Sequence, residues 1–304
     1  MNNLSYIRLI MARVSFSQYS MWHSCPHQYK LAYIDKLGEN SSNIHSIFGT
    51  AMHETLQNYL EKCLRISKSQ ADKMIDLKEY LKERMRDAYL KETEGEIGNT
   101  TICTKEEMVE FLEDGNVLLD WFQKPKNFNK FFSLKHDELV AIEQPINTKI
   151  SENVNFMGFI DLIIRDTFNG RYRIIDFKTS TRGWSKYQKS DPVKNAQILL
   201  YKKFYAELLN ISEDVIDVEF IILKRKVQVV EDIPTHRMSK HVPANGKVSV
   251  NKAWKGFTEF VESVFDKDGN YRTDIEFPKN ATKLCEWCEF FDRGICDRGL
   301  KNLN

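Results

Sequence analysis

The stretch RIIDFKTS, residues 173–180, places two opposite charges inside what otherwise reads as a buried β-strand. Ile174, Ile175 and Phe177 are typical of a strand that packs on both faces. Asp176 and Lys178 are not, because burying a charge costs several kcal/mol unless another group compensates it. The sequence therefore predicts that further charged groups lie beside these two.

The partner strand is the apolar run at 154–166, VNFMGFIDLIIRD. The pair Asn169-Gly170, between the two runs, favours a β-hairpin with a two-residue type I′ turn. With that turn, Phe168 lies opposite Arg171.

This register places Asp161 opposite Lys178 and Ile163 opposite Asp176. Opposite residues share one face of a sheet, and diagonal neighbours lie roughly 7 Å apart. A slip of one residue would move one strand's side chains to the other face. We therefore expect Asp161, Asp176 and Lys178 to converge on one side of the sheet.

Two carboxylates beside a lysine suit a divalent cation. Mg²⁺ and Mn²⁺ prefer oxygen ligands and keep waters for chemistry. A lysine near such a water can orient or deprotonate it and offset the charge that develops on a phosphate. The alternative is an Asp–Lys pair at a strand end without a functional role.

Composition and charge narrow the class of protein. The 304 residues are 42% hydrophobic and 29% charged, as in a globular rather than a disordered chain. No apolar run is long enough to span a bilayer, and the N-terminus shows no signal-peptide cleavage site, so we expect a cytoplasmic protein.

The net charge of +1 hides an uneven distribution. Residues 171–203 carry net +7 and residues 221–260 carry net +5, whereas residues 76–114 carry net −6. The basic excess is what a phosphate-contacting surface would show, although exposed lysines are also common on ordinary surfaces.

The rest of the chain alternates between helical and extended patterns, and no Walker-type phosphate loop is present, which argues against ATP hydrolysis. We expect helices at 15–35, 49–65, about 192–210 and near 252–267, a mostly helical stretch at 70–135, and strands at 139–147, 154–166, 171–180 and 215–223.

Six short motifs, taken in order, resemble the PD-(D/E)XK nuclease superfamily. Within it they are similar to the RecB/AddB-type group, which includes the CRISPR-adaptation exonucleases and phage relatives. The motifs are SQYSMWHSCPHQYKLAY (17–33), FGTAMHETL (48–56), MGFIDLI (157–163), IIDFKTS (174–180), QILLY (197–201) and CEWC with a later Cys (285–296).

The resemblance implies an α/β, restriction-endonuclease-like fold with a mixed central sheet flanked by helices. Residues 1–304 would form a single nuclease domain, with 65–135 as a mostly helical insertion and 280–304 as a Cys-rich, cluster-binding tail.

The resemblance also implies roles for particular residues. Asp161 and Asp176 would bind Mn²⁺ or Mg²⁺, with the backbone carbonyl of Phe177 as a third ligand. His53 would complete the set and tilt the preference towards Mn²⁺. Lys178 would position the attacking water.

Gln197 and Tyr201 lie four residues apart and hence on one helix face. They would brace the lysine or touch the scissile phosphate, or they belong to an ordinary amphipathic helix. Glu143 would be an outer acid of the site or a solvated strand glutamate.

Four cysteines form a second candidate site. Cys285 and Cys288 are spaced as in metal sites, Cys296 follows, and Cys25 lies far upstream. The resemblance implies that these four hold a 4Fe–4S cluster; a structural zinc ion is the alternative. Cys103 would be a plain structural thiol.

The implied function is metal-dependent hydrolysis of DNA, by an exonuclease acting on single-stranded ends in recombination, repair or processing, in a bacterial or phage-infected cell. A separate helicase or recombination protein would be its partner. The alternatives are a non-catalytic DNA-end-binding module with a vestigial site, and RNA as the substrate. Basic residues predicted to contact DNA are Lys224, Arg225, Lys226, Arg237, Lys240 and Lys247.

Overall fold

The computed structural model describes residues 11–39, 42–95, 102–227 and 235–297. The chain separates into two compact units. Unit 1 comprises Met1–Glu39, Pro145–Gly158 and Asn251–Asn304, and unit 2 comprises Asn40–Gln144 and Phe159–Val250. The expectation of a single nuclease domain stays a prediction.

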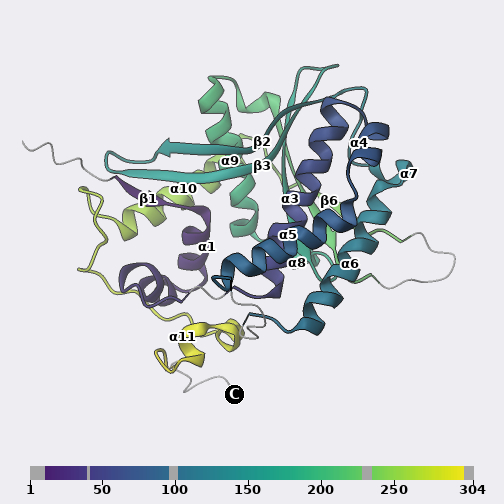
Figure 1. The fold of residues 1–304 in the computed structure, drawn as a ribbon. Helices are drawn as coiled ribbons and strands as arrows, with labels where there is room; N and C mark the ends of the chain where they lie inside the picture. The colour runs from purple at the N-terminus through teal and green to yellow at the C-terminus, as the bar shows by residue number, and fades with distance from the viewer. Residues whose placement is uncertain (1–10, 40–41, 96–101, 228–234, 298–304) are drawn as a thin grey trace, which may run out of the picture. The chain divides into compact units, whose positions relative to one another are not determined.

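The sheet of unit 2 is mixed, which confirms the predicted fold class (Figure 1). β3 pairs antiparallel with β4, β4 pairs parallel with β5, and β5 pairs antiparallel with β6, while β2 pairs with β3. The apolar, β-branched runs of β3, β4 and β5 favour these buried strands. The strands are β2 (Asp137–Lys149), β3 (Val154–Asp166), β4 (Tyr172–Ser180), β5 (Ile216–Lys224) and β6 (Met238–His241).

Side chains that alternate along these strands divide the sheet into two faces. Leu162, Ile175, Phe177 and Ile221 belong to one apolar core with the helices α3, α5 and α6. The helix α9 packs against β4 and β5, and Figure 1 shows it on the other side of these strands. The helices of unit 2 are α3 (Ile44–Arg65), α4 (Lys68–Met74), α5 (Leu77–Glu92), α6 (Lys105–Gln123), α7 (Pro125–Phe128), α8 (Lys186–Ser190) and α9 (Pro192–Leu209), with the 3-10 turn η2 (Glu213–Val215).

Local capping fixes where the two site-bearing helices begin. The side chain of Asn43 accepts hydrogen bonds from the backbone at the start of α3, and the Oγ of Ser46 accepts one from the Asn43 N–H. Asp191 caps α9, and Pro192 occupies its first position, where a missing N–H costs nothing. α9 ends at Leu209, and the following residue, Asn210, adopts the left-handed conformation.

Unit 1 joins segments that are far apart in the chain. β1 (Ala12–Val14) runs parallel to the start of β3. Tyr19 packs against Phe257 and Phe260, with ring centroids 5.5 and 5.6 Å apart. The remaining elements are α1 (Phe16–Ser24), α2 (Pro26–Tyr29), the π-helical turn η1 (Lys30–Ile34), α10 (Lys247–Val264), which begins in unit 2, the 3-10 turn η3 (Lys283–Trp287) and α11 (Glu289–Asp292).

The prediction of one continuous helix at 15–35 is wrong. Cys25 is extended, with φ −158°, and separates α1 from α2. Pro26 explains the break, because its ring disfavours a helical conformation at the preceding residue and it starts the next helix at the first position.

The predicted hairpin register is also wrong, by two residues. Leu162 pairs with Ile175, and the connection is the four-residue loop at 167–170. A type I′ turn needs positive φ at both central residues, but of Asn169 and Gly170 only the glycine has it, at +73°.

The side chain of Asp166 organises this loop instead, by accepting hydrogen bonds from the Phe168 N–H and the Asn169 amide. A shift of two residues preserves the face of every side chain. Asp161 therefore keeps its predicted side but moves from opposite Lys178 to the level of Asp176.

Among the described residues, none of the helices has both the length and the apolar character that crossing a membrane requires.

Candidate active site

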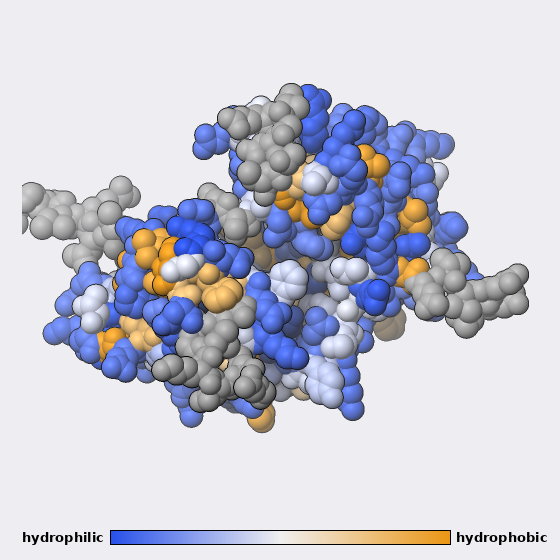
Figure 2. Space-filling view, turned by 90° about the horizontal axis from the view of Figure 1, so that it is seen from below, coloured by the Kyte–Doolittle hydropathy of each residue, from blue (hydrophilic) through white to orange (hydrophobic). Residues whose placement is uncertain are grey.

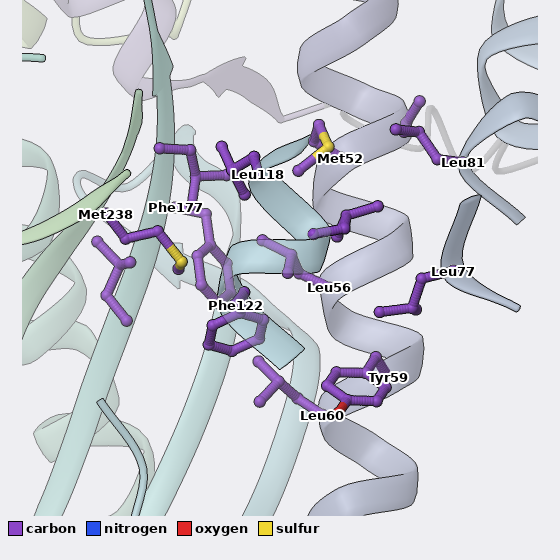
Figure 3. Packing of buried hydrophobic residues seen from close by; sticks show 14 of the residues in the cluster. Met52, Leu56, Tyr59, Leu60, Leu77, Leu81, Leu118, Phe122, Phe177 and Met238 are labelled. Atoms are coloured by element: carbon purple, nitrogen blue, oxygen red, sulfur yellow. The ribbon is translucent and has the colours of Figure 1, made fainter. Parts of the chain in front are cut away.

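Phe177 fixes the direction in which its two charged neighbours point. Its ring is fully buried among Leu118, Phe122 and Met238, where Figure 3 shows it between the strand and the helical layer. Successive side chains of a strand point to opposite faces. Asp176 and Lys178 are therefore directed away from this apolar core.

The β3–β4 ladder ends beside the site. Leu162 and Ile175 are the last paired residues on this side. Beyond them, Oδ2 of Asp161 accepts a hydrogen bond of 2.8 Å from the N–H of Phe177. The carboxylate thus takes a backbone donor that strand pairing would otherwise use, and it lies at the point where the two strands separate.

Lys178 and Asp176 form a close ion pair, with Nζ 2.8 Å from Oδ2. Burial disfavours the charged lysine, but Asp176 and then Asp161 outweigh it and raise the pKa of Lys178. Burial raises the pKa of both Asp161 and Asp176 to about 6, although Lys178 acts in the opposite direction on each. One ammonium therefore does not fully compensate two buried carboxylates.

His53 approaches the same carboxylates from α3. Its Nδ1 lies 3.5 Å from Oδ2 of Asp161. Burial lowers the pKa of His53, although the Coulombic effect of Asp176 opposes this, so the ring is neutral at pH 7 and able to bind a metal. One turn earlier, an added Cβ on Gly49 would lie 3.5 Å from Oγ1 of Thr179, an ordinary van der Waals contact, so α3 lies against β4 at this point.

Gln57 is a site residue that the sequence analysis missed. It is 5% exposed, and its amide donates to Oε1 of Glu143 and, at 3.3 Å, to the backbone carbonyl of Asp161. Glu143 has a positive φ of +49°, a strained conformation for a residue with a side chain. The available signal was spacing, because Gln57 follows His53 by four residues on one helix face.

Gln197 and Tyr201 lie together on α9, as predicted from their spacing. The Gln197 amide donates to the Tyr201 hydroxyl at 3.5 Å. Burial raises the pKa of Tyr201, and Asp176 and Asp161 add to this effect. The phenol is therefore neutral and close enough to both carboxylates to sense their charge.

The donor set suits a divalent cation. Oδ2 of Asp176 is buried and, within the described structure, forms the ion pair with Lys178 but accepts no hydrogen bond. In the same described residues, no group of three or more His, Cys, Asp and Glu side chains is already gathered as metal ligands. Lys178 pairs with Asp176, and the Phe177 N–H donates to Asp161. The negative charge that these two contacts leave uncompensated is what a hard cation would neutralise.

The four predicted cluster cysteines line one pocket in unit 1. Cys25, Cys285, Cys288 and Cys296 are all partly exposed and none is in a disulfide. The Asn280 N–H donates to Sγ of Cys25 at 3.4 Å. Thiols separated by up to 271 positions in the chain thus line one pocket, but in the described structure no three of them are gathered as metal ligands.

The residues predicted to contact DNA occupy different environments. Arg225 is buried, and both Arg225 and Lys226 form ion pairs with Glu110 and Asp114. Lys240 lies 3.4 Å from Glu219.

The other three members of this set are not paired with acids in the described structure. Arg237 donates to the backbone carbonyl of Arg225. Lys224 is half-buried, and Lys247 is exposed at the start of α10.

Comparison with known proteins agrees with this geometry. A family model described as the PD-(D/E)XK nuclease superfamily matches residues 13–297. No curated protein matches the chain.

Proposed function

Because the chain belongs to the PD-(D/E)XK nuclease superfamily, we propose that it is a metal-dependent deoxyribonuclease that uses the Asp161–Asp176–Lys178 site. The observation that carries the proposal is the position of these three side chains. A buried carboxylate, Asp176, a largely buried one, Asp161, and one ammonium meet where β3 and β4 separate, next to a neutral imidazole. This combination serves phosphodiester hydrolysis better than it serves folding stability.

In this proposal Asp161 and Asp176 hold Mn²⁺ or Mg²⁺, with the Phe177 carbonyl and His53 as further ligands. A bound metal would supply Lewis-acid chemistry at this site, lowering the pKa of a water and offsetting negative charge on the phosphate. Lys178, held 2.8 Å from Asp176, orients the attacking water and holds positive charge beside the phosphate.

Three further residues support the ligands. Gln57 fixes the backbone of Asp161 through its carbonyl and ties Glu143 to the site. Tyr201, oriented by Gln197, is a neutral donor near both carboxylates and is suited to a phosphate oxygen.

For the pocket of unit 1, we propose a 4Fe–4S cluster bound by Cys25, Cys285, Cys288 and Cys296. Bound zinc is the competing occupant, because four thiolates serve both metals. In either case the bound metal would cross-link the N-terminal segment to the tail.

We further propose exonuclease action on single-stranded ends, in recombination, repair or processing, with a separate helicase or recombination protein as partner. The cytoplasm of a bacterial or phage-infected cell is the proposed location. These finer assignments derive from the motif resemblance of the sequence, and DNA contacts at Lys224, Arg225, Lys226, Arg237, Lys240 and Lys247 stay predictions.

The test is cleavage of end-labelled linear single strands, circular single strands, linear duplex and supercoiled plasmid, with Mg²⁺, Mn²⁺ or EDTA. An exonuclease degrades linear single strands and leaves circles intact, and Asp176→Ala removes the activity. Cleavage of circles would identify an endonuclease. Metal-independent binding to DNA ends without any cleavage would instead favour the alternative, a non-catalytic end-binding module.

A further inference from the structure

The segment after the catalytic strand carries positive charge that the fold does not neutralise. Arg182, Lys186 and Lys189 lie in residues 181–190, with Lys194 just beyond and Lys224 at the end of the neighbouring strand β5. In the described part of the chain, none of these five cations forms an ion pair with a carboxylate, unlike Lys226 and Lys240.

The charges are close enough to act on one another. Burial lowers the pKa of Lys224, and the charge of Lys189 lowers it further. The same two causes, in the same order, lower the pKa of His241. Asp191 is the sole acid in residues 181–195, and its carboxylate is engaged by the N–H groups of Val193 and Lys194.

An aromatic side chain stands exposed among these cations. Tyr187 on α8 is 86% exposed. Its ring therefore does not contribute the free energy of folding that burying a large aromatic side chain would provide. By contrast, the neighbouring Trp184 is packed, with its ring 5.1 Å from that of Phe220 and with Lys194 over its face. Tyr187 thus offers a free π-face on a segment that Trp184 anchors.

The segment is held rigidly enough to form a preorganised surface. The Arg225 and Lys226 N–H groups donate to the carbonyls of Ser180 and Thr181. Gly183, with φ +96°, turns the chain where the Lys224 side chain packs within 3.4 Å of an added Cβ.

The helix that carries Tyr187 is fixed as well. Ser185 and Gln188 form a reciprocal capping box at the start of α8. The Asn195 amide donates to the carbonyl of Lys189 at its end. A surface that is already ordered loses less entropy on binding.

We propose that Arg182, Lys186, Tyr187, Lys189, Lys194 and Lys224 form a platform that receives single-stranded DNA beyond the C-terminal end of the catalytic strand β4. The inference rests on the proposed nuclease function and adds the surface that presents the substrate. Tyr187 follows Lys178 by nine residues, so it lies at most about 30 Å from the lysine. An exposed ring stacks on unpaired bases, which a duplex does not offer, while the cations contact the backbone.

The test is fluorescence anisotropy with a labelled oligothymidylate of about 20 nucleotides in EDTA, where no metal-dependent cleavage occurs. Tyr187→Ala should weaken binding about tenfold. Phe168→Ala is the matched control, because Phe168 is 83% exposed in the loop between β3 and β4, and it should change affinity less than about twofold.

Charge is tested in the same assay. The double variant Lys186→Ala/Lys189→Ala should reduce the slope of log affinity against log salt by about 1.4, because each phosphate contact to a single strand contributes about 0.7. Lys78→Ala/Lys82→Ala removes the same charge from α5, where both lysines are ion-paired, and should leave the slope unchanged.

Three results would each overturn the platform. The Tyr187 and Phe168 variants could bind with equal affinity, or the two lysine double variants could show equal salt slopes. The protein could also bind duplex DNA or RNA more tightly than the single-stranded oligothymidylate. Binding in EDTA requires no catalysis, so the two proposals fail separately. A wild-type protein that binds through Tyr187 yet cleaves no DNA with Mg²⁺ or Mn²⁺ would refute the nuclease function and keep the platform.

Discussion

Asp161→Asn should stabilise the metal-free protein while abolishing nuclease activity. Burial raises the pKa of Asp161 from 3.8 to about 6, so keeping this carboxylate charged at neutral pH costs about 3 kcal/mol. An amide removes the charge and still offers an oxygen to the Phe177 N–H, the contact that the carboxylate makes at 2.8 Å. We therefore expect a gain of roughly 1–3 kcal/mol in the free energy of unfolding at pH 7.5.

The gain should depend on pH with a defined sign. Because the folded pKa of Asp161 is raised, its contribution to wild-type stability is fully present below about pH 4 and is lost as the pH rises through about 6. The stability difference between variant and wild type should therefore be large at pH 7.5 and small near pH 4.

Thermal unfolding in EDTA measures the effect, and a gain of 1–3 kcal/mol should appear as a rise in Tm of about 2–5 °C. Asp137→Asn is the matched control, because Oδ2 of Asp137 lies 2.7 Å from Arg173 and its loss should lower Tm. Mn²⁺ should raise the Tm of wild type but not that of Asp161→Asn. A lower Tm for Asp161→Asn in EDTA at pH 7.5 would refute the argument that this carboxylate is held at a cost.

Four other variants test the two sites. Lys178→Met should reduce cleavage by about 10²–10⁴-fold, and persistence of the Mn²⁺-dependent rise in Tm would show that the lysine acts in the reaction and not in metal binding. Gln57→Ala should lower the apparent affinity for Mn²⁺ or the cleavage rate about 10–100-fold without altering binding of single strands in EDTA; unchanged kinetics would remove Gln57 from the site. Anaerobically purified protein should be brown, and Cys288→Ala should lose the colour and lower Tm, while Cys103→Ala keeps the colour. If the wild-type protein is colourless and carries stoichiometric zinc, zinc and not the cluster is the bound metal. If the protein is metal-free and its four thiols react freely, both the cluster and the zinc site are contradicted.

Hydrophobic patterning was sufficient to predict the central strands and the face of the sheet on which the site lies. The apolar run at 154–166 coincides with β3, and the strand period places Asp176 and Lys178 on one face whichever turn connects the hairpin. The register was not predictable from Asn169-Gly170, because the side chain of Asp166 competes for the turn and stabilises a longer loop.

The periodicity of hydrophobic residues does not predict contacts between segments that are distant in the sequence. Gln57 reads as a polar position on an amphipathic helix, yet it is buried because β2 and β3 supply the acceptors for its amide. The pairing of Arg225 with Glu110 and Asp114 similarly depends on how α6 packs. A charge count along the chain cannot distinguish such neutralised cations from free ones. The surface in Figure 2 is mostly hydrophilic, so hydropathy alone does not single out a binding surface there.

The discontinuity of unit 1 has a consequence for the order of events during synthesis. The chain leaves the ribosome from its N-terminus, and about 210 residues separate Glu39 from Asn251. At 5–20 residues per second, the segment that contains Tyr19 and Cys25 waits roughly 10–40 s before its partners Phe257, Phe260 and the tail cysteines exist. All segments of unit 2 are made within that interval. A newly made chain can therefore build the nuclease site before the four-cysteine pocket is formed.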